Sequence, residues 1–277
     1  YLRIRENFQD KNKFSKDKAP KKEKKMNCDY KTFYELARTR RSYRKLKSDP
    51  LPDGAIEKIM ECGRWAMNGG NAQPWEFIVV TNPETKLQMA KDWDAAFKEF
   101  KVIEESCVPE RRHAVFSRPE GLPNWKDCPA MIGIIGDRRK MQTSVLHPGF
   151  YGSEGGDGIG ATFYKDLGNV AQMMHLAVAS LGLGSEWLSV ERPLQLKWQR
   201  LLNIPDDLEL HTFVLVGYPD MEAPPGFRRE LSQFVHYETY NYDLYNDTAG
   251  VRDMILESRG AVRKAEGAAY KIKPVSE

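Results

Sequence analysis

Cysteine and histidine are both scarce in this chain. Its 277 residues include four cysteines and five histidines. No two cysteines form a CxxC pair, and no two histidines have the HExxH spacing of a zinc-binding helix. We therefore expect neither a disulfide framework nor a metal site.

The chain also lacks a long apolar run. A membrane-spanning helix needs roughly 18 consecutive apolar residues, whereas the longest runs here, 130–136 and 212–217, have the length of strands. No charged segment followed by an apolar one opens the chain, as a secretory signal would. We therefore expect a cytoplasmic protein with no membrane partner.

Several motifs of nucleotide binding and nucleophilic catalysis are missing as well. The glycine cluster at 152–160 has no GK[ST] ending and follows no predicted strand, unlike a P-loop. No G-x-G-x-x-G follows a strand, and no GxSxG elbow occurs. His175 lies in an apolar helical stretch, which predicts a buried structural histidine. If the chain is an enzyme, a bound cofactor is expected to supply the chemistry.

Positive charge is concentrated in the first 26 residues. This segment has 10 Lys and Arg against 4 Asp and Glu, whereas the rest of the chain has 32 against 35. The body is therefore mildly acidic and has no basic surface typical of nucleic-acid binding. We predict a disordered basic tail over 1–26. It is either a solvated arm or a phosphate-binding arm, and Met26 is a candidate natural start.

Hydrophobic periodicity predicts a mixture of helices and strands. Helical spacing predicts helices at 29–40, 54–66, 83–100, 163–181, 193–202 and 251–265. Apolar and β-branched runs predict strands at 76–81, 130–136, 186–190 and 211–218. The stretch 163–181 has almost no polar face, which predicts a helix buried in the core or at a subunit interface. Because the two kinds of element do not alternate strictly, we predict an α+β sheet flanked by helices.

The predicted organisation has three parts. The tail precedes a folded domain over 27–240, and a C-terminal extension follows over 241–277. Within the domain, residues 101–165 are rich in proline and glycine but also contain aromatic residues, which predicts a lid insert around the strand at 130–136. Trp125 and Tyr151 are its candidate substrate-binding residues, because flat rings stack on planar molecules. The alternative is that these rings belong to the core.

Two short motifs contain the candidate binding residues. Residues 40–44, Arg-Arg-Ser-Tyr-Arg, place three guanidinium groups at the end of the first predicted helix, and 228–229 offer two more. Arginine forks suit phosphate groups. The segment 68–73 offers three side-chain amides beside two glycines, which suits a polyol or the edge of a heterocycle. Taken alone, each motif is more typical of a solvated turn.

In their order along the chain, these motifs resemble those of the FMN-dependent nitroreductase superfamily. The similarity extends from about residue 34 to 237. It includes RRSYR at 40–44, NAQPW at 71–75, the apolar helix ending in LGLG at 181–184, VGYP at 216–219 and the arginine pair at 228–229. The resemblance implies a central, mostly antiparallel sheet flanked by helices, in an intertwined homodimer with FMN at the subunit interface.

The resemblance also implies which residues contact the flavin. The phosphate and ribityl chain would be held by Arg40, Arg41, Ser42 and Arg44, with Arg228 and Arg229 closing on the same phosphate. The residues reaching the flavin from the partner subunit would be Met67, Asn68, Gly69 and Asn71. Leu188 and Ser189 would lie along the isoalloxazine edge, with a backbone N–H directed at N5. No side chain is assigned a catalytic role, because the flavin performs the hydride chemistry.

The implied activity is that of an oxidoreductase. NADH or NADPH would reduce FMN, which passes hydride to an electron-poor organic acceptor such as a nitroaromatic, a quinone or an activated alkene. One alternative is a specialised FMN enzyme of the same superfamily, either a reductive dehalogenase, a flavin-fragmenting enzyme or a dehydrogenase. Another is a flavin-binding protein without catalytic activity.

Overall fold

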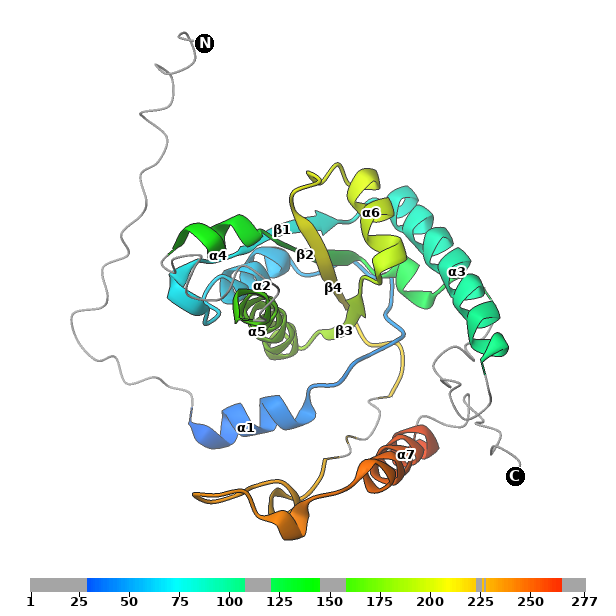
Figure 1. The fold of residues 1–277 in the computed structure, drawn as a ribbon. Helices are drawn as coiled ribbons and strands as arrows, with labels where there is room; N and C mark the ends of the chain where they lie inside the picture. Colours follow the sequence, from blue (N-terminus) through cyan, green and yellow to red (C-terminus); the bar gives the residue numbers. More distant parts are fainter. Residues whose placement is uncertain (1–28, 108–120, 145–157, 223–225, 227, 266–277) are drawn as a thin grey trace, which may run out of the picture. The chain divides into compact units, whose positions relative to one another are not determined.

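A computed structural model describes residues 29–107, 121–144, 158–222, 226 and 228–265 of the chain. The chain divides into two units, residues 1–35 and 36–277. All candidate site residues belong to the larger unit, whose sheet and surrounding helices are drawn in Figure 1.

An antiparallel sheet of four strands forms the centre of the larger unit. Its strands are β1 (Trp75–Val80), β2 (Ala130–Gly136), β3 (Gly184–Ser189) and β4 (Glu209–Gly217), arranged in the order β1-β2-β4-β3. All seven residues of β2 are buried, and so are most of those in β4. Both inner strands are apolar on both faces because helices cover each side of the sheet.

Strand pairing fixes the register of this sheet. Trp75 of β1 lies opposite Gly136 of β2, and Ala130 at the other end of β2 lies opposite Val216 of β4. The pairing of β2 with β4 shifts between Ile134 and Ile135. Such an irregularity locally bends and twists a sheet.

The helices form a layer on each face of the sheet (Figure 1). On one face lie α2 (Ala55–Gly63) and α5 (Gly158–Ser180), with the short α4 (Arg138–Ser144) packed against α5. On the other face lie α3 (Pro83–Ser106), α6 (Arg192–Leu201) and the short 3-10 helix η4 (Asn124–Asp127). The remaining described helices are α1 (Tyr30–Thr39), η1 (Gly69–Asn71), η6 (Leu231–Gln233), η7 (Tyr242–Leu244) and α7 (Thr248–Ala265).

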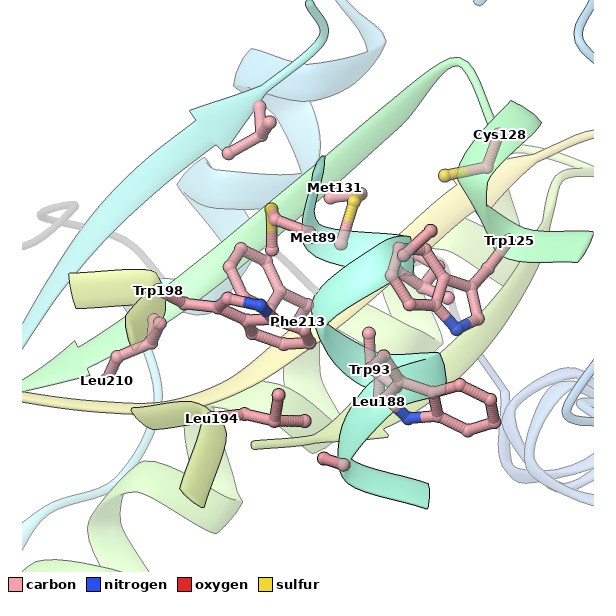
Figure 2. Packing of buried hydrophobic residues seen from close by; sticks show 14 of the residues in the cluster. Met89, Trp93, Trp125, Cys128, Met131, Leu188, Leu194, Trp198, Leu210 and Phe213 are labelled. Carbon is pink, nitrogen blue, oxygen red and sulfur yellow. The ribbon is translucent and has the colours of Figure 1, made fainter. Parts of the chain in front are cut away.

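Each face of the sheet has its own hydrophobic core. The core under α3 and α6 contains an aromatic cluster in which Trp125 meets Trp93 and Trp198 edge-on, at centroid distances of 6.4 and 6.2 Å. Figure 2 shows these rings together with Phe213 from β4. The core under α2 and α5 is mainly aliphatic, apart from Phe163 and Trp75. Two filled cores hold the sheet in place between its helices.

The predicted α+β class, with an antiparallel sheet flanked by helices, is confirmed. The exposed side of α5 in the single chain presents Lys165, Asn169 and Gln172, so burial of this helix on all sides stays a prediction that requires a subunit interface. The irregular prediction for 101–165 was too broad. Helix α3 continues to Ser106, α4 lies within the region, and α5 begins at Gly158. Residues 1–28, 108–120 and 145–157 lie outside the described residues, so the tail, the proposed start at Met26 and the lid stay predictions.

Within the described residues, no helix is long and apolar enough to cross a membrane. The division into tail, domain and C-terminal extension also stays a prediction.

Candidate functional site

The RRSYR segment lies along the beginning of β3. Ser42 forms an isolated parallel bridge with Ser185, and the Tyr43 N–H donates to the Ser185 carbonyl over 3.0 Å. Gly184 permits this close approach, because a Cβ there would lie 3.0 Å from the Tyr43 ring. Backbone pairing therefore fixes Arg40 and Arg41 beside the end of α5.

These elements surround a pocket of about 210 Å³, called here the arginine pocket. Its walls come from the end of α1, the segment 40–43, the turn between α5 and β3, and Pro219 after β4. Both Arg40 and Arg41 line it. The pocket is therefore cationic at one wall, while the other walls combine apolar residues with Thr39 and Ser185.

Two guanidinium groups line this pocket, and a third, that of Arg228, lies close enough to act on Arg40. Burial lowers the pKa of Arg40, and the charges of Arg228 and Arg41 lower it further. Gly226 lies against Arg41, since a Cβ at this glycine would be 2.8 Å from a guanidinium nitrogen. Two segments that are far apart in the sequence thus bring like charges together, which favours binding of an anion.

The two remaining predicted arginines are arranged differently. Arg44 is exposed at the end of the segment. Arg229 lies over the Phe234 ring, 4.9 Å from its centroid, and its Nη1 is 3.7 Å from the Met254 sulfur. The described contacts of Arg229 are therefore with the C-terminal segment and not with the arginine pocket.

A buried histidine stands behind the pocket. His175 Nδ1 lies 2.7 Å from the Ser185 hydroxyl, and the ring stacks on Trp187 at 5.7 Å. Burial lowers the pKa of His175 to about 4, with a smaller contribution from Arg40, so the ring is neutral at pH 7. Its Nε2 is buried without a hydrogen-bond partner among the described residues.

The predicted burial of His175 is confirmed, but only one of its ring nitrogens is satisfied. Sequence reasoning missed Ser185 as a neighbour. The sole available signal was the position of Ser185 directly after the LGLG motif that ends the helix.

The second motif forms a strained loop, called here the amide loop (residues 67–73). Gly70, Asn71 and Gln73 have φ values of 59°, 53° and 46°. Left-handed backbone is uncommon for residues other than glycine and is often found at functional sites. The Asn68 carboxamide oxygen accepts the Gln73 N–H over 2.9 Å, which braces the loop from inside.

Helix α5 holds the amide loop from outside. The Gly69 N–H lies 3.2 Å from both carboxylate oxygens of Asp166, and the Asn169 side chain donates to the Met67 carbonyl over 3.0 Å. Burial raises the pKa of Asp166, and the Gly69 N–H partly opposes that effect. The Met67 side chain itself is 81% exposed, as expected of a residue available to a second molecule.

The arginine pocket and the amide loop lie at opposite ends of α5. Asp166 contacts the loop, whereas Ala179 lines the pocket, and thirteen residues separate the two. At a rise of 1.5 Å per residue, they are about 20 Å apart along the helix. One copy of the chain therefore presents two separated groups of predicted site residues, called here the two half-sites.

The last two predicted flavin neighbours, Leu188 and Ser189, are the final residues of strand β3. Leu188 is buried, and its carbonyl accepts the Thr212 hydroxyl over 2.8 Å. Ser189 is exposed beside it. These two residues lie at the opposite end of β3 from Ser185.

The structure describes only one of the two predicted substrate residues. Trp125 is 4% exposed and packs in the aromatic cluster, which is the arrangement expected of a core residue. A role in acceptor binding stays a prediction that this burial does not favour. Tyr151 lies outside the described residues.

Comparison with known proteins agrees with this geometry. A sequence model of the Nitroreductase family matches residues 37–218, which include the whole sheet and both half-sites except 226–229. The chain belongs to the nitroreductase family. A protein named NADH dehydrogenase from Thermus thermophilus is 27% identical over 196 residues, covering 71% of this chain and 91% of the relative.

Two further matches bear on the family's chemistry. An iodotyrosine deiodinase from Thermotoga neapolitana is 24% identical over 213 residues, covering 76% of this nitroreductase-family chain and 100% of the relative. The crystal structure of an iodotyrosine deiodinase bound to FMN and 3-iodo-L-tyrosine has a TM-score of 0.58 and 22% identity. It covers 75% of this chain and 99% of that one, which shows a shared fold.

Proposed function

We propose that this protein binds FMN and transfers hydride from NAD(P)H to an electron-poor organic acceptor. The observation that carries the proposal is that Arg40 and Arg41 line one small pocket, with Arg228 close enough to lower the pKa of Arg40. The family membership supports an oxidoreductase, and the FMN in the related iodotyrosine deiodinase structure supports the choice of flavin.

The residues present fit the phosphate end of FMN. Three guanidinium groups and the Ser42 hydroxyl would hold the phosphate and ribityl chain, with Arg44 and Arg229 at its margin. The unpartnered Nε2 of His175 is a further polar atom behind the same wall. A phosphate there would relieve the repulsion among the arginines, which no neutral ligand could do.

The complete site requires a second copy of the chain. Because the two half-sites are about 20 Å apart along α5, Met67, Asn68, Gly69 and Asn71 would reach the flavin bound to the partner's arginine pocket. Leu188 and Ser189 would lie along the flavin edge. We therefore propose a homodimer with two equivalent sites, each built from both subunits.

Bound FMN supplies the hydride chemistry, and the chain orients the reactants around it. The strained amide loop would present its carboxamides at a fixed angle, because Asp166 and Asn169 hold its backbone. No dedicated dinucleotide-binding half is needed if nicotinamide and acceptor occupy the same flavin face in turn.

Reductive dehalogenation is a second candidate. It is favoured by the iodotyrosine deiodinase of Thermotoga neapolitana, whose entire length aligns with this chain. Halide released from an iodinated or brominated phenol under reducing conditions would identify this activity. NAD(P)H oxidation that depends on a nitroaromatic or quinone would identify the first.

Flavin retention tests the cofactor assignment. The protein is mixed with FMN, desalted, and its bound flavin measured after denaturation. Arg41→Ala removes one charge-assisted partner worth ~1.5–3 kcal/mol, so FMN affinity should fall roughly ten- to a hundredfold. Arg200→Ala, an exposed arginine on α6, is the matched control and should retain flavin like the wild type.

A wild-type protein that takes up no FMN would refute the cofactor assignment. Equal retention by the Arg41 and Arg200 variants would refute the position of the phosphate.

A further inference from the structure

A second and larger cleft lies apart from the arginine pocket. It has a volume of about 770 Å³ and is bounded by the segment 45–49, the beginning of α3, the segment around η4 and Asp220 after β4. The two cavities share no lining residue. This volume is in the range of sites that bind small molecules.

Lysine is the main charged residue of this cleft, called here the lysine cleft. Four lysines line it, against three aspartates. Lys45 pairs with Asp220 at 2.6 Å, and Lys126 pairs with Asp127 at 2.5 Å. Hydrogen bonding and charge from Lys45 lower the pKa of Asp220, so that carboxylate is ionised and already engaged.

Two of the lysines have no such partner. Among the described residues, no carboxylate lies within ion-pair distance of Lys47 or Lys86, although Asp49 lines the same cleft. Lys47 is exposed near the entrance, whereas Lys86 is only 4% exposed. The cleft therefore contains a deeply buried cation without a counter-ion in the described chain.

The surroundings of Lys86 favour an anionic ligand. Its ammonium donates to the Cys128 carbonyl, which uses one of three N–H donors. A buried charge without an opposite charge is costly. The positive end of the α3 dipole adds to the attraction for an anion. The Glu84 and Thr85 N–H groups already donate to the Asn82 side chain, so the ligand would meet lysine side chains.

We propose that the lysine cleft is a second ligand site, which binds a small molecule bearing a phosphate or carboxylate group. Lys86 is the buried anchor of that group, and Lys47 closes on it from the entrance. Ser48, Thr81 and Asn124 line the same cleft and offer neutral hydrogen-bonding groups to the rest of the molecule. The site is independent of the flavin and would serve as a binding site for an acidic metabolite.

Titration calorimetry on FMN-saturated protein tests this proposal. Inorganic phosphate and succinate are titrated separately, at an ionic strength held constant with KCl, so that the two oxyanions are distinguished. The wild type should show one saturable site per subunit for at least one of them. Lys86→Gln should weaken binding roughly ten- to a hundredfold, and Lys47→Gln should weaken it severalfold.

Two control variants separate this site from other effects. Lys91→Gln removes an exposed lysine of the same helix that does not line the cleft, and it should bind the anion like the wild type. Arg41→Ala removes the arginine pocket's charge and should also leave this binding unchanged. Anion binding that survives in Arg41→Ala therefore belongs to the lysine cleft, whether or not FMN binds as proposed.

The competing explanation is that Lys86 only ties η4 to α3 through the Cys128 carbonyl. In that case Lys86→Gln lowers the thermal midpoint, while anion binding is absent or unchanged, and the proposal is overturned. If Lys86→Gln does not fold, the Lys47→Gln variant alone tests the proposal. Its side chain is exposed, so this substitution should not prevent folding. Unchanged binding in that variant would equally overturn the site.

Discussion

At the scale of single residues, burial determines the protonation of His175. Its folded pKa of about 4 is below its ordinary value of 6.5. Between these values the unfolded chain binds a proton that the folded chain does not, so the free energy of unfolding falls as pH falls. At pH 4.5 the loss from this residue should be about 2–3 kcal/mol relative to pH 7.

Urea unfolding at pH 7 and pH 4.5 measures this effect. His175→Asn should be less stable than the wild type at pH 7, because packing against Trp187 is lost. It should nevertheless lose less stability between the two pH values. An identical loss in both proteins would show that His175 does not titrate as its burial predicts.

The cysteines should differ sharply in reactivity. Cys128 is fully buried, and burial raises the pKa of its thiol to about 12. At pH 8 only roughly one molecule in ten thousand has the thiolate that reacts. Cys62 is exposed. Iodoacetamide should therefore label Cys62 in the native protein and Cys128 only after unfolding, as peptide mapping by mass spectrometry would detect. Equal native labelling would contradict the burial of Cys128.

The sequence predicted a group of candidate arginines by residue type, but it did not predict how each of them is directed. Arg40, Arg41 and Arg228 do converge. Arg229, one residue further, turns toward Phe234 and Met254. The direction of an exposed side chain depends on contacts distant in sequence, which motif order does not contain. For the same reason Asp166 was not predicted to hold Gly69, 97 residues earlier.

At the scale of elements, Trp125 fastens η4 to α3 and α6. Its ring contacts Trp93 and Trp198 edge-on inside the core. Trp125→Ala should lower the free energy of unfolding by about 3–5 kcal/mol, the usual cost of deleting a buried large ring. Leu122→Ala, an exposed residue of the same segment, should change it by less than about 0.5 kcal/mol.

Measuring kcat/KM with two different acceptors distinguishes this structural role of Trp125 from its predicted role in acceptor binding. If Trp125 is only a core residue, Trp125→Phe should keep the ratio of kcat/KM for a nitroaromatic and a quinone. A changed ratio with an unchanged thermal midpoint would instead support the lid prediction.

Elements with a strong pattern were predicted more accurately than their ends. The all-apolar strand at 130–136 has the same bounds in the structure. The start of α5 was placed five residues too late, because Gly158 and Gly160 are typical of a loop and packing outweighs their low helix propensity. The end of α3 was placed six residues too early, at the start of the proline-rich region, although Ile103 continues the helical spacing of Phe97 and Phe100.

At the scale of the whole molecule, the proposed homodimer predicts complementation between subunits that each have one damaged half-site. Arg41→Ala damages the arginine pocket, and Asn71→Gly removes a carboxamide from the amide loop while keeping its left-handed backbone. Each variant alone should bind FMN poorly. In a mixed dimer one site combines both defects, whereas the other combines two intact halves.

Unfolding the two variants together and refolding them should therefore restore flavin binding to about a quarter of all sites, given random association. Each variant refolded alone is the control. Bound FMN after desalting is the measurement. No recovery on mixing would indicate that each site is contained within one subunit.

The strand order could not be predicted from the pattern of the chain. Strands β3 and β4 are neighbours in sequence and in space, but β4 also pairs with β2, about 80 residues earlier. Periodicity reports which face of a strand is buried and not which strand lies beside it. The family resemblance implied a mostly antiparallel sheet flanked by helices, but it did not include the order of the strands.

That strand order also bears on synthesis. Of the described strands, β4 is the last to leave the ribosome, yet it lies between β2 and β3 in the middle of the sheet. Until residue 217 has emerged, the entirely apolar β2 pairs only with β1 and has an open edge of unpaired backbone groups. The nascent chain therefore passes through a long aggregation-prone interval, during which a chaperone that shields β2 would raise the yield of folded protein.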